Sequence, residues 1–288
     1  VGFETEGFEP IPETTGPLVI GRVESIEGLT GFKKPIRHCM VNVGNANGTG
    51  ELQSIICGAR NFSEGDMVVV ALPGCVLPGD FAISARETYG RMSAGMICSA
   101  AELGLTPQQN KGIITLDPQL QVEVGADARP AIGLSDTVFD VNITPDRGYA
   151  LSARGLSREI ASALDLDFSD VAENPQLAGL SVTVPDVSGD LLSVELQPET
   201  KALRFGLRKV SGIDPTVESP WWLQRELMLC GQRPVNAATD VTNYLMLLLG
   251  QPMHAFDVDR ITGDLVVRCA AEGEKMTTLD DVQRELHT

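Results

Sequence analysis

Short apolar stretches separated by turn residues fill the first third of the chain. The stretches LVIGRVESI, CMVNVG, LQSIICGA, MVVVALPG and DFAISARE are rich in valine and isoleucine, and glycine, asparagine, aspartate or proline stands between them. Several short strands at this spacing are typical of a small β-barrel or sandwich. Residues 18–100 are therefore predicted to form β structure.

Beyond residue 130 the pattern changes to a short alternating strand followed by a helix. Leu156, Ile160 and Leu164 recur every fourth residue, which predicts a helix with one apolar stripe. Ser152 can cap the start of that helix. The polar, proline-containing stretch 170–179 is the best candidate for a linker.

A second helix is predicted in the stretch SPWWLQRELMLCGQRPVN. Ser219 stands at its cap position, Pro220 at its first position and Gly231 after its end. One face of this helix carries Leu223, Leu227 and Cys230.

A third helix is predicted in VTNYLMLLLGQPMHAFD, residues 241–257. Thr242 and Asn243 fall in its first turn, and Gly250 with Pro252 ends it. His254, one of three histidines in the chain, follows in the turn. The predicted buried stripe consists of Val241, Tyr244, Leu245 and Leu248.

Strands are predicted on both sides of these last two helices. LSVTVPDV and LLSVELQ precede the helices, and GDLVVRCAAEGEKMTTLDD gives a strand, a turn and a strand near residue 288. The whole chain therefore predicts an α+β protein, and a length of 288 residues suggests two or three domains.

The composition is that of a soluble, acidic protein. The formal net charge is −17, and acidic residues outnumber basic residues in both halves of the chain. Such acidity argues against a broad, nonspecific grip on nucleic acid, DNA included. No apolar run is long enough to span a membrane, and the first residues, VGFETEGFEP, resemble no signal peptide and lack an initiator methionine.

Most familiar chemical signatures are missing from the sequence. It has no glycine-rich phosphate loop, no HExxH and no GxSxG, and its six cysteines form no CxxC pair. No metal site is predicted. The cysteines are interpreted as small buried residues of a protein in a reducing compartment.

One constellation has the residue types that hydrolysis requires: Thr242, Asn243, Pro252 and His254. Such polar groups can orient a water molecule and stabilise an oxyanion. A helix of this length separates its ends by roughly 15 Å, so the residues could border one groove only if the turn folds back. The alternative is structural, with these side chains bonding to nearby backbone groups, and on the residues alone it is favoured.

A second candidate surface lies on the predicted barrel. Arg60, Arg86 and Arg91 are the basic residues nearest to it. Small barrels with exposed loops often bind single-stranded or looped nucleic acid. The alternative is an ordinary solvated face, which the net charge favours.

Five stretches together resemble one family. In order and spacing, IICGARNFSEGDMVVVALPGCVLPGDFAI, SAGMICSAAELGL, FDVNITPDRGYALSARGLSREIA, SPWWLQREL and DVTNYLMLLLGQPMHAFD resemble the N-terminal half of the bacterial phenylalanyl-tRNA synthetase β subunit. The resemblance covers nearly the whole chain.

The resemblance implies a fold in three parts. Residues 17–130 would form a five-stranded OB-fold β-barrel that binds tRNA. This barrel would be inserted in a small α+β domain made of residues 1–16 and 131–172. Residues 175–288 would be the first part of an α+β editing domain, whose remainder, with the glutamate that recognises the tyrosine hydroxyl, lies downstream in that family.

The resemblance also implies a function. Thr242, Asn243, Pro252 and His254 match positions that line the pocket for hydrolysis of tyrosine mischarged on tRNA(Phe). The family enzyme is a cytoplasmic (αβ)₂ heterotetramer that uses ATP and Mg²⁺ bound outside the region covered here, and its α subunit activates the amino acid. No residue of this chain is expected to catalyse aminoacylation, and the chain alone is expected to be inactive.

Two hypotheses thus compete. In the first, the chain is part of a tRNA ligase and holds a tRNA-binding module and part of an editing site. In the second, the chain is a non-catalytic OB-fold module for tRNA binding or assembly. The stretches SPWWLQREL and QPMHAFD favour the first, because a stand-alone barrel would end near residue 130.

Overall fold

A computed structural model describes residues 1–33, 36–108, 112–173, 192–278 and 280–287. The chain divides into two compact units. One combines Val1–Glu173 with Thr216–Met253, and the other combines Asn174–Pro215 with His254–Thr288. The predicted strand LSVTVPDV and most of the predicted linker 170–179 lie outside the described residues.

The largest sheet of the first unit is antiparallel throughout. Its hydrogen-bonded order is β10-β5-β2-β3-β4, and β11 pairs with β5 next to β10. The strands are β2 (Leu18–Leu29), β3 (Ile36–Asn42), β4 (Gln53–Cys57), β5 (Met67–Ala71), β10 (Met96–Ile97) and β11 (Thr115–Leu116). β structure in residues 18–100 is thus confirmed.

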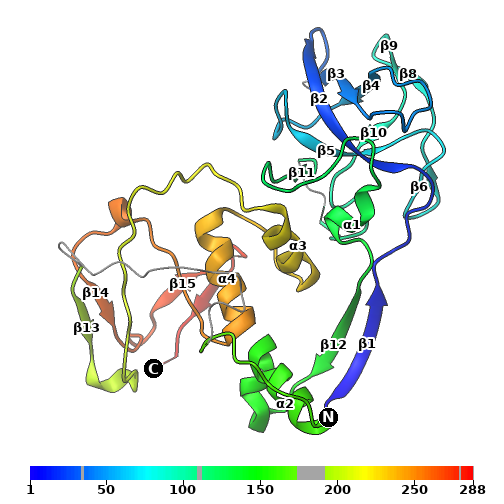
Figure 1. Cartoon of the computed structure of the whole chain (residues 1–288). Coiled ribbons are helices and arrows are strands. Elements are labelled where there is room, and N and C mark those ends of the chain that lie inside the picture. The colour runs from blue at the N-terminus through cyan, green and yellow to red at the C-terminus, as the bar shows by residue number, and fades with distance from the viewer. Residues whose placement is uncertain (34–35, 109–111, 174–191, 279, 288) are drawn as a thin grey trace. The chain divides into compact units, whose positions relative to one another are not determined.

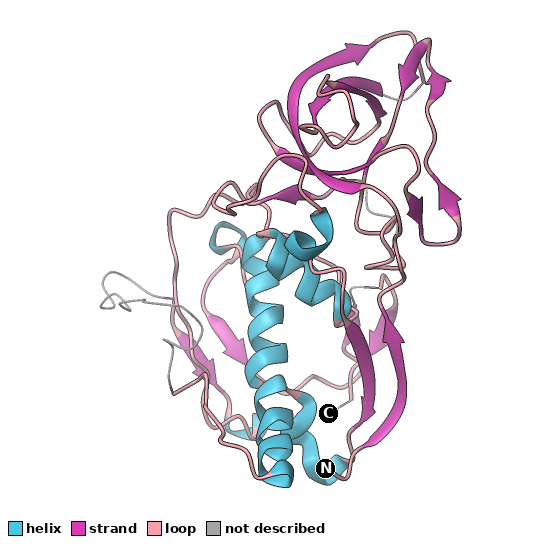
Figure 2. Ribbon diagram, turned by 45° about the vertical axis from the view of Figure 1, so that its right-hand side comes forward, coloured by secondary structure: helices cyan, strands magenta, loops and turns pink. Residues whose placement is uncertain are grey.

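This sheet curls strongly (Figure 2), but its six described strands form an open sheet and not a closed ring. No ladder joins the end strands β4 and β10 within the described residues. The Ala94 amide donates to the Ser54 carbonyl at 2.8 Å, and bonds that involve the Gln53, Ser54 and Ser93 side chains also link β4 to the residues before β10. The mixed α and β architecture is confirmed, whereas a closed five-stranded barrel stays a prediction.

Strand β5 is apolar along its whole length because both of its faces are covered. Val68 and Val70 belong to the apolar cluster enclosed by the curled sheet. Val69 and Ala71 belong to a second cluster on the outer face, where Ile132 and Trp221 also pack. A strand buried on both faces reads as a continuous apolar run, which explains the MVVVA sequence.

Two short hairpins extend this part of the chain. Strand β6 (Val76–Leu77) pairs with β7 (Phe81–Ala82), and β8 (Arg86–Thr88) pairs with β9 (Arg91–Ser93).

The residues before the large sheet pair with residues after it. Strand β1 (Glu4–Pro10) runs antiparallel to β12 (Thr137–Asn142), from Glu4 opposite Asn142 to Pro10 opposite Thr137 (Figure 1). The short helix α1 (Ala128–Ile132) precedes β12. This pairing supports a discontinuous small domain around the sheet, although the boundaries 1–16, 131–172 and 17–130 stay predictions.

Helix α2 (Ala153–Leu164) follows the 3-10 segment η1 (Pro145–Leu151). The Ser152 hydroxyl accepts a hydrogen bond from the Gly155 amide at 3.1 Å, so the predicted cap is confirmed. Gly155 presses against η1 so closely that a Cβ there would lie 1.9 Å from the Tyr149 carbonyl oxygen.

The predicted apolar stripe of α2 is not its buried face. Ile160 and Leu164 are 38% and 60% exposed, and the buried residues are Gly155 and Ala161. The helix approaches its neighbours through small residues, which permit close backbone contact, and the larger side chains are left outside that contact.

Helices α3 (Trp221–Leu229) and α4 (Ala237–Leu249) complete the first unit. The predicted cap of α3 was wrong. Pro220 holds the cap position, and the Ser219 hydroxyl donates instead to Asp240 in α4. Of the residues on the predicted face, Leu223 and Leu227 are buried, whereas Cys230 is exposed.

The second unit contains two small sheets. Strand β13 (Val194–Leu196) runs parallel to β14 (Leu265–Val267), and β15 (Lys275–Thr277) runs antiparallel to β16 (Gln283–Glu285). The 3-10 segments are η3 (Pro198–Thr200) and η4 (Val258–Arg260). The strands predicted around 191–197 and 263–281 are confirmed over their described residues.

The cysteines are only partly as predicted. Four are buried, and burial raises the pKa of the Cys39 thiol to about 12. Cys230 and Cys269 are exposed, which corrects the prediction for these two. Each follows the end of a regular element, α3 or β14, where the chain turns to the surface.

Candidate functional site

Helix α4 begins one turn earlier than the sequence predicted. The Asn236 side chain caps it by accepting a hydrogen bond from the Thr239 amide at 3.0 Å. Thr242 and Asn243 therefore lie in the second turn. The Thr242 hydroxyl donates to the Thr239 carbonyl at 2.7 Å, so its proton is used and its oxygen keeps acceptor capacity.

The buried residue of α4 is a carboxylate and not the predicted apolar stripe. Asp240 is 1% exposed, whereas Val241 is 46% exposed and Tyr244 is half-buried. The carboxylate accepts the Ser219 hydroxyl at 2.6 Å and the Val235 amide at 2.8 Å. The hydrophobic pattern gave no signal for this residue.

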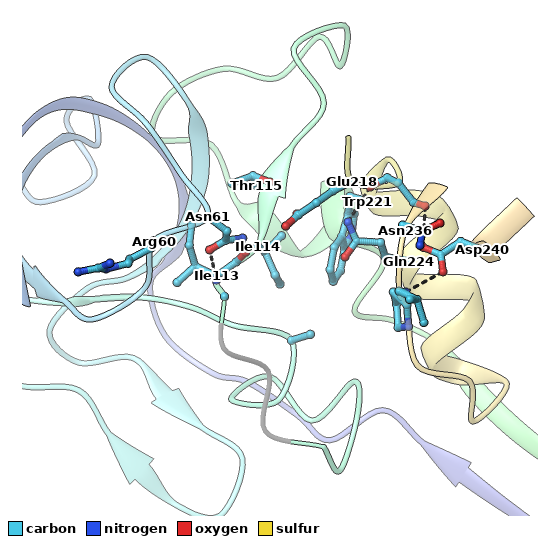
Figure 3. Close-up of a pocket in the computed structure, with 15 residues that line it drawn as sticks. Arg60, Asn61, Ile113, Ile114, Thr115, Glu218, Trp221, Gln224, Asn236 and Asp240 are labelled. Carbon is cyan, nitrogen blue, oxygen red and sulfur yellow. Dashed lines mark hydrogen bonds between the residues drawn. The ribbon is translucent and has the colours of Figure 1, made fainter. Parts of the chain in front are cut away.

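A cavity of about 410 Å³ lies next to Asp240 (Figure 3). One wall comes from the large sheet and its loops, and the other from α3 and the start of α4. The Asn61 amide fixes the first wall by bonding both the amide and the carbonyl of Ile113 at 2.9 Å. The polar side chains that line the cavity are Arg60, Asn61, Thr115, Glu218, Ser219, Gln224, Asn236 and Asp240.

This cavity suits recognition more than catalysis. Its amide groups and the Arg60 guanidinium can donate hydrogen bonds, and Glu218 can accept them. Both oxygens of Asp240 are already bonded within the protein. Histidine and cysteine are absent from the residues that line the cavity, and the Ser219 hydroxyl is already donated to Asp240.

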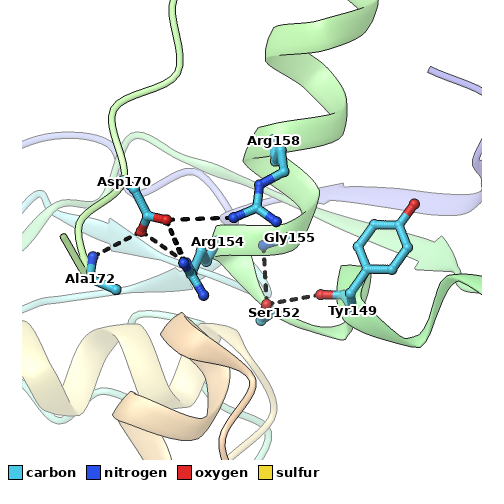
Figure 4. Close-up of polar contacts among 7 residues, drawn as sticks. All are labelled: Tyr149, Ser152, Arg154, Gly155, Arg158, Asp170 and Ala172. Carbon is cyan, nitrogen blue, oxygen red and sulfur yellow. Dashed lines mark hydrogen bonds and ion pairs between the residues drawn. The ribbon is translucent and has the colours of Figure 1, made fainter.

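Pro252 borders a second cavity, of about 480 Å³, between the start of α2 and the end of α4. Arg154 and Arg158 line it together with Tyr149. Both arginines pair with Asp170, at 2.5 Å and 3.5 Å (Figure 4). Hydrogen bonds from Arg154 hold the pKa of the Asp170 carboxyl below its usual value.

His254 belongs to the second unit, whereas Thr242, Asn243 and Pro252 belong to the first. The His254 side chain is exposed, and its ring centroid lies 4.4 Å from that of Phe256. The convergence of these four residues on one pocket therefore stays a prediction.

The three candidate arginines fall in two places. Arg86 and Arg91 lie on one hairpin, β8–β9, where Arg91 pairs with Glu27 of β2 at 3.2 Å. Arg60 lines the cavity beside α3 instead.

Two further searches cover only the described part of the chain. Within it, no group of three or more His, Cys, Asp or Glu side chains could hold a metal ion. In the same residues, no helix combines the length and the apolarity needed to cross a membrane.

Comparison with protein families identifies two segments. Residues 18–127 match the putative tRNA binding domain, and residues 201–288 match the B3/4 domain. Among solved structures, the chaperone CsaA from Bacillus anthracis is similar over 38% of this chain and 86% of its own, at 13% identity and a TM-score of 0.28. That similarity is too low to support a conclusion about the fold.

Relatives of high identity match the chain from end to end. The phenylalanine–tRNA ligase β subunit of Corynebacterium glutamicum is 76% identical over 287 residues, which cover 100% of this chain and 34% of that protein. The subunit of the same name from Thermobifida fusca is 52% identical over 99% of this chain and 33% of its own length. The chain thus spans about a third of these relatives, and it belongs to the phenylalanine–tRNA ligase β-subunit family.

Proposed function

We propose that this chain contributes tRNA binding and hydrolytic editing to a phenylalanine–tRNA ligase. The observation that carries the proposal is 76% identity to the Corynebacterium glutamicum β subunit over the whole chain. For the complete enzyme, the proposal includes ATP-dependent charging of tRNA(Phe) with phenylalanine, Mg²⁺, a cytoplasmic location and an α subunit in an (αβ)₂ tetramer.

In this proposal, the two family segments divide the work. Residues 18–127 form an OB-fold domain that binds tRNA, and the B3/4 match over residues 201–288 belongs to an editing domain. The second match favours the ligase over a non-catalytic OB-fold module, because such a module has no need of a B3/4 domain.

Editing has a physical reason. Tyrosine differs from phenylalanine by one hydroxyl group, and an apolar pocket rejects an added hydroxyl only weakly. A second site that binds the hydroxyl can remove the error. In the proposed editing site, the Thr242 oxygen, the Asn243 amide and the His254 ring hold the ester and the attacking water, and Pro252 shapes the wall. Thr242 acts there as an acceptor, because its proton is bonded to Thr239.

The test is His254→Ala in the full-length enzyme with its α subunit. We expect Tyr-tRNA(Phe) hydrolysis to slow by about tenfold or more, since a positioned acid–base group contributes at least that much. Charging with phenylalanine should not change. The exposed residue His287 supplies a matched control, His287→Ala. Equal hydrolysis rates in the two variants would give His254 a structural role only.

A further inference from the structure

Two aromatic rings are exposed together on the putative tRNA binding domain. Phe32 follows β2, and Tyr89 lies in the turn between β8 and β9. Their ring centroids are 4.7 Å apart, and their planes meet at 71°. Phe32 is 43% exposed and Tyr89 is 45% exposed, so the pair touches and still presents ring surface to solvent.

The turn that holds Tyr89 does not itself favour tyrosine. Tyr89 and Gly90 connect the paired residues Thr88 and Arg91, and their φ angles are +54° and +73°. A two-residue hairpin with both φ angles positive is a type I′ turn, in which asparagine followed by glycine is preferred. A bulky side chain at positive φ is an outlier, and such strain is concentrated at functional positions.

Cationic residues flank the two aromatic residues in the chain. Arg86 and Arg91 lie on one face of the β8–β9 hairpin, because Arg91 is paired with Thr88, two residues along the strand from Arg86. Lys33 follows Phe32 in the chain and is exposed. Glu27 pairs with Arg91, whereas Arg86 and Lys33 form no ion pair within the described residues.

This combination favours RNA over a protein partner. Unpaired bases stack on exposed aromatic rings, while arginine and lysine follow the phosphates. The centre of a protein interface also favours aromatic residues and arginine, but it is depleted of lysine and glutamate, whereas here Lys33 follows Phe32 and Glu27 pairs with Arg91.

We propose that Phe32 and Tyr89 form a stacking site for unpaired RNA bases, with Arg86 and Lys33 against the flanking phosphates. The proposal rests on the proposed tRNA-binding function of residues 18–127 and names the contact that provides it. Base-paired RNA does not fit this site, because its bases already stack inside the duplex.

The test measures binding of a fluorescein-labelled ten-nucleotide oligoadenylate and of deacylated tRNA to the 288-residue chain, by anisotropy at low salt. Tyr89→Asn keeps the preferred turn, and Phe32→Leu keeps apolar volume without a ring. Each should weaken oligoadenylate binding about 5- to 150-fold, the range expected for losing one stacked base. Tyr89→Asn should unfold at the same or a higher temperature.

The matched control is Phe139→Leu. Phe139 is 63% exposed and also belongs to an aromatic pair, with Phe8 at 6.3 Å, but it lies on β12 outside the large sheet. Its replacement should leave oligoadenylate binding unchanged.

Several outcomes overturn the stacking site. Unchanged oligoadenylate affinity in Tyr89→Asn and Phe32→Leu would do so, and with tRNA still bound the proposed function would stand. Equal competition by a ten-base-pair RNA duplex would also reject it. If the unmodified chain binds neither RNA, the stacking site and the tRNA-binding function of this domain both fail. Loss of self-association in Tyr89→Asn with unchanged RNA binding would assign the rings to a protein contact.

Discussion

Asp240 brings a carboxylate into the protein interior beside apolar side chains that remain half-exposed. It connects two segments, because it receives the hydroxyl of Ser219 before α3 and the amide of Val235 before α4. A buried polar group without a partner costs about 1–3 kcal/mol. The position and orientation of α4, with its candidate residues, therefore depend on this carboxylate.

Replacement of Asp240 by alanine should lower the free energy of unfolding of the first unit by about 2–4 kcal/mol, because two buried donors lose their acceptor. Both tryptophans of the chain, Trp221 and Trp222, lie in α3. Their fluorescence during urea unfolding therefore reports on this unit. The exposed carboxylate Asp167, in the same unit, provides a control, Asp167→Ala, with an expected change within about 0.5 kcal/mol. Similar losses in both variants would contradict a structural role for the Asp240 bonds.

At the scale of elements, one arginine joins α3 to the end of α1. The Arg225 guanidinium donates to the Gly133 carbonyl, at 3.0 Å from Nε and 2.7 Å from Nη2, and to Asp136 at 2.7 Å. The Trp221 indole donates to the Ile132 carbonyl at 3.3 Å. Carbonyl groups at the end of a helix lack partners within the helix, and here α3 supplies them.

This link should depend on pH. The hydrogen bond from Arg225 holds the pKa of Asp136 below its usual value. The pair therefore stabilises the fold above the unfolded pKa of about 3.9, and its contribution is lost as the pH falls through the lower folded pKa. Asp136→Asn should reduce stability at pH 7 by at most about 1 kcal/mol, because the carboxylate is half-exposed. Urea titrations of both proteins should converge toward pH 3; a constant difference would argue against the ion pair.

The sequence predicted elements better than it predicted their contacts. The strands of the large sheet could be read from runs such as MVVVA, since strands need only apolar residues between turn signals. The start of α4 was missed because Asn236, six residues before Thr242, caps the helix by a local bond that no periodicity shows. The buried face of α2 was missed because Gly155 and Ala161 bury little apolar area, yet they permit close packing.

The candidate residues show the same limit. The residue types of Thr242, Asn243 and His254 could be recognised in the sequence, but hydrogen bonds such as that from Thr242 to Thr239 became visible only in the structure. The Phe32–Tyr89 pair is formed by residues 57 positions apart in the sequence, so no local pattern could predict it.

At the scale of the whole molecule, a net charge of −17 limits how this chain can hold RNA. Several arginines of the first unit are occupied by carboxylates, Arg91 by Glu27 and Arg225 by Asp136 among them. Few cations remain to replace counterions on a phosphate backbone. Affinity for RNA must therefore come mainly from contacts that do not depend on charge.

The salt dependence of tRNA binding tests this statement. The slope of log K against log salt is about −0.7 to −0.9 for each phosphate neutralised. We expect a slope no steeper than about −3 for the 288-residue chain, measured by anisotropy at several salt concentrations. Arg86→Gln should make it shallower by about one. Tight binding with a slope steeper than about −5 would reveal a basic surface that the charge distribution does not suggest.

The contact between Gly155 and the Tyr149 carbonyl has a consequence for sequence variation. Since even the Cβ of alanine would overlap that oxygen, only glycine fits at position 155. In a saturation library selected for folding, position 155 should return glycine alone. Position 164, where the Leu164 side chain is exposed to solvent, should accept many residues.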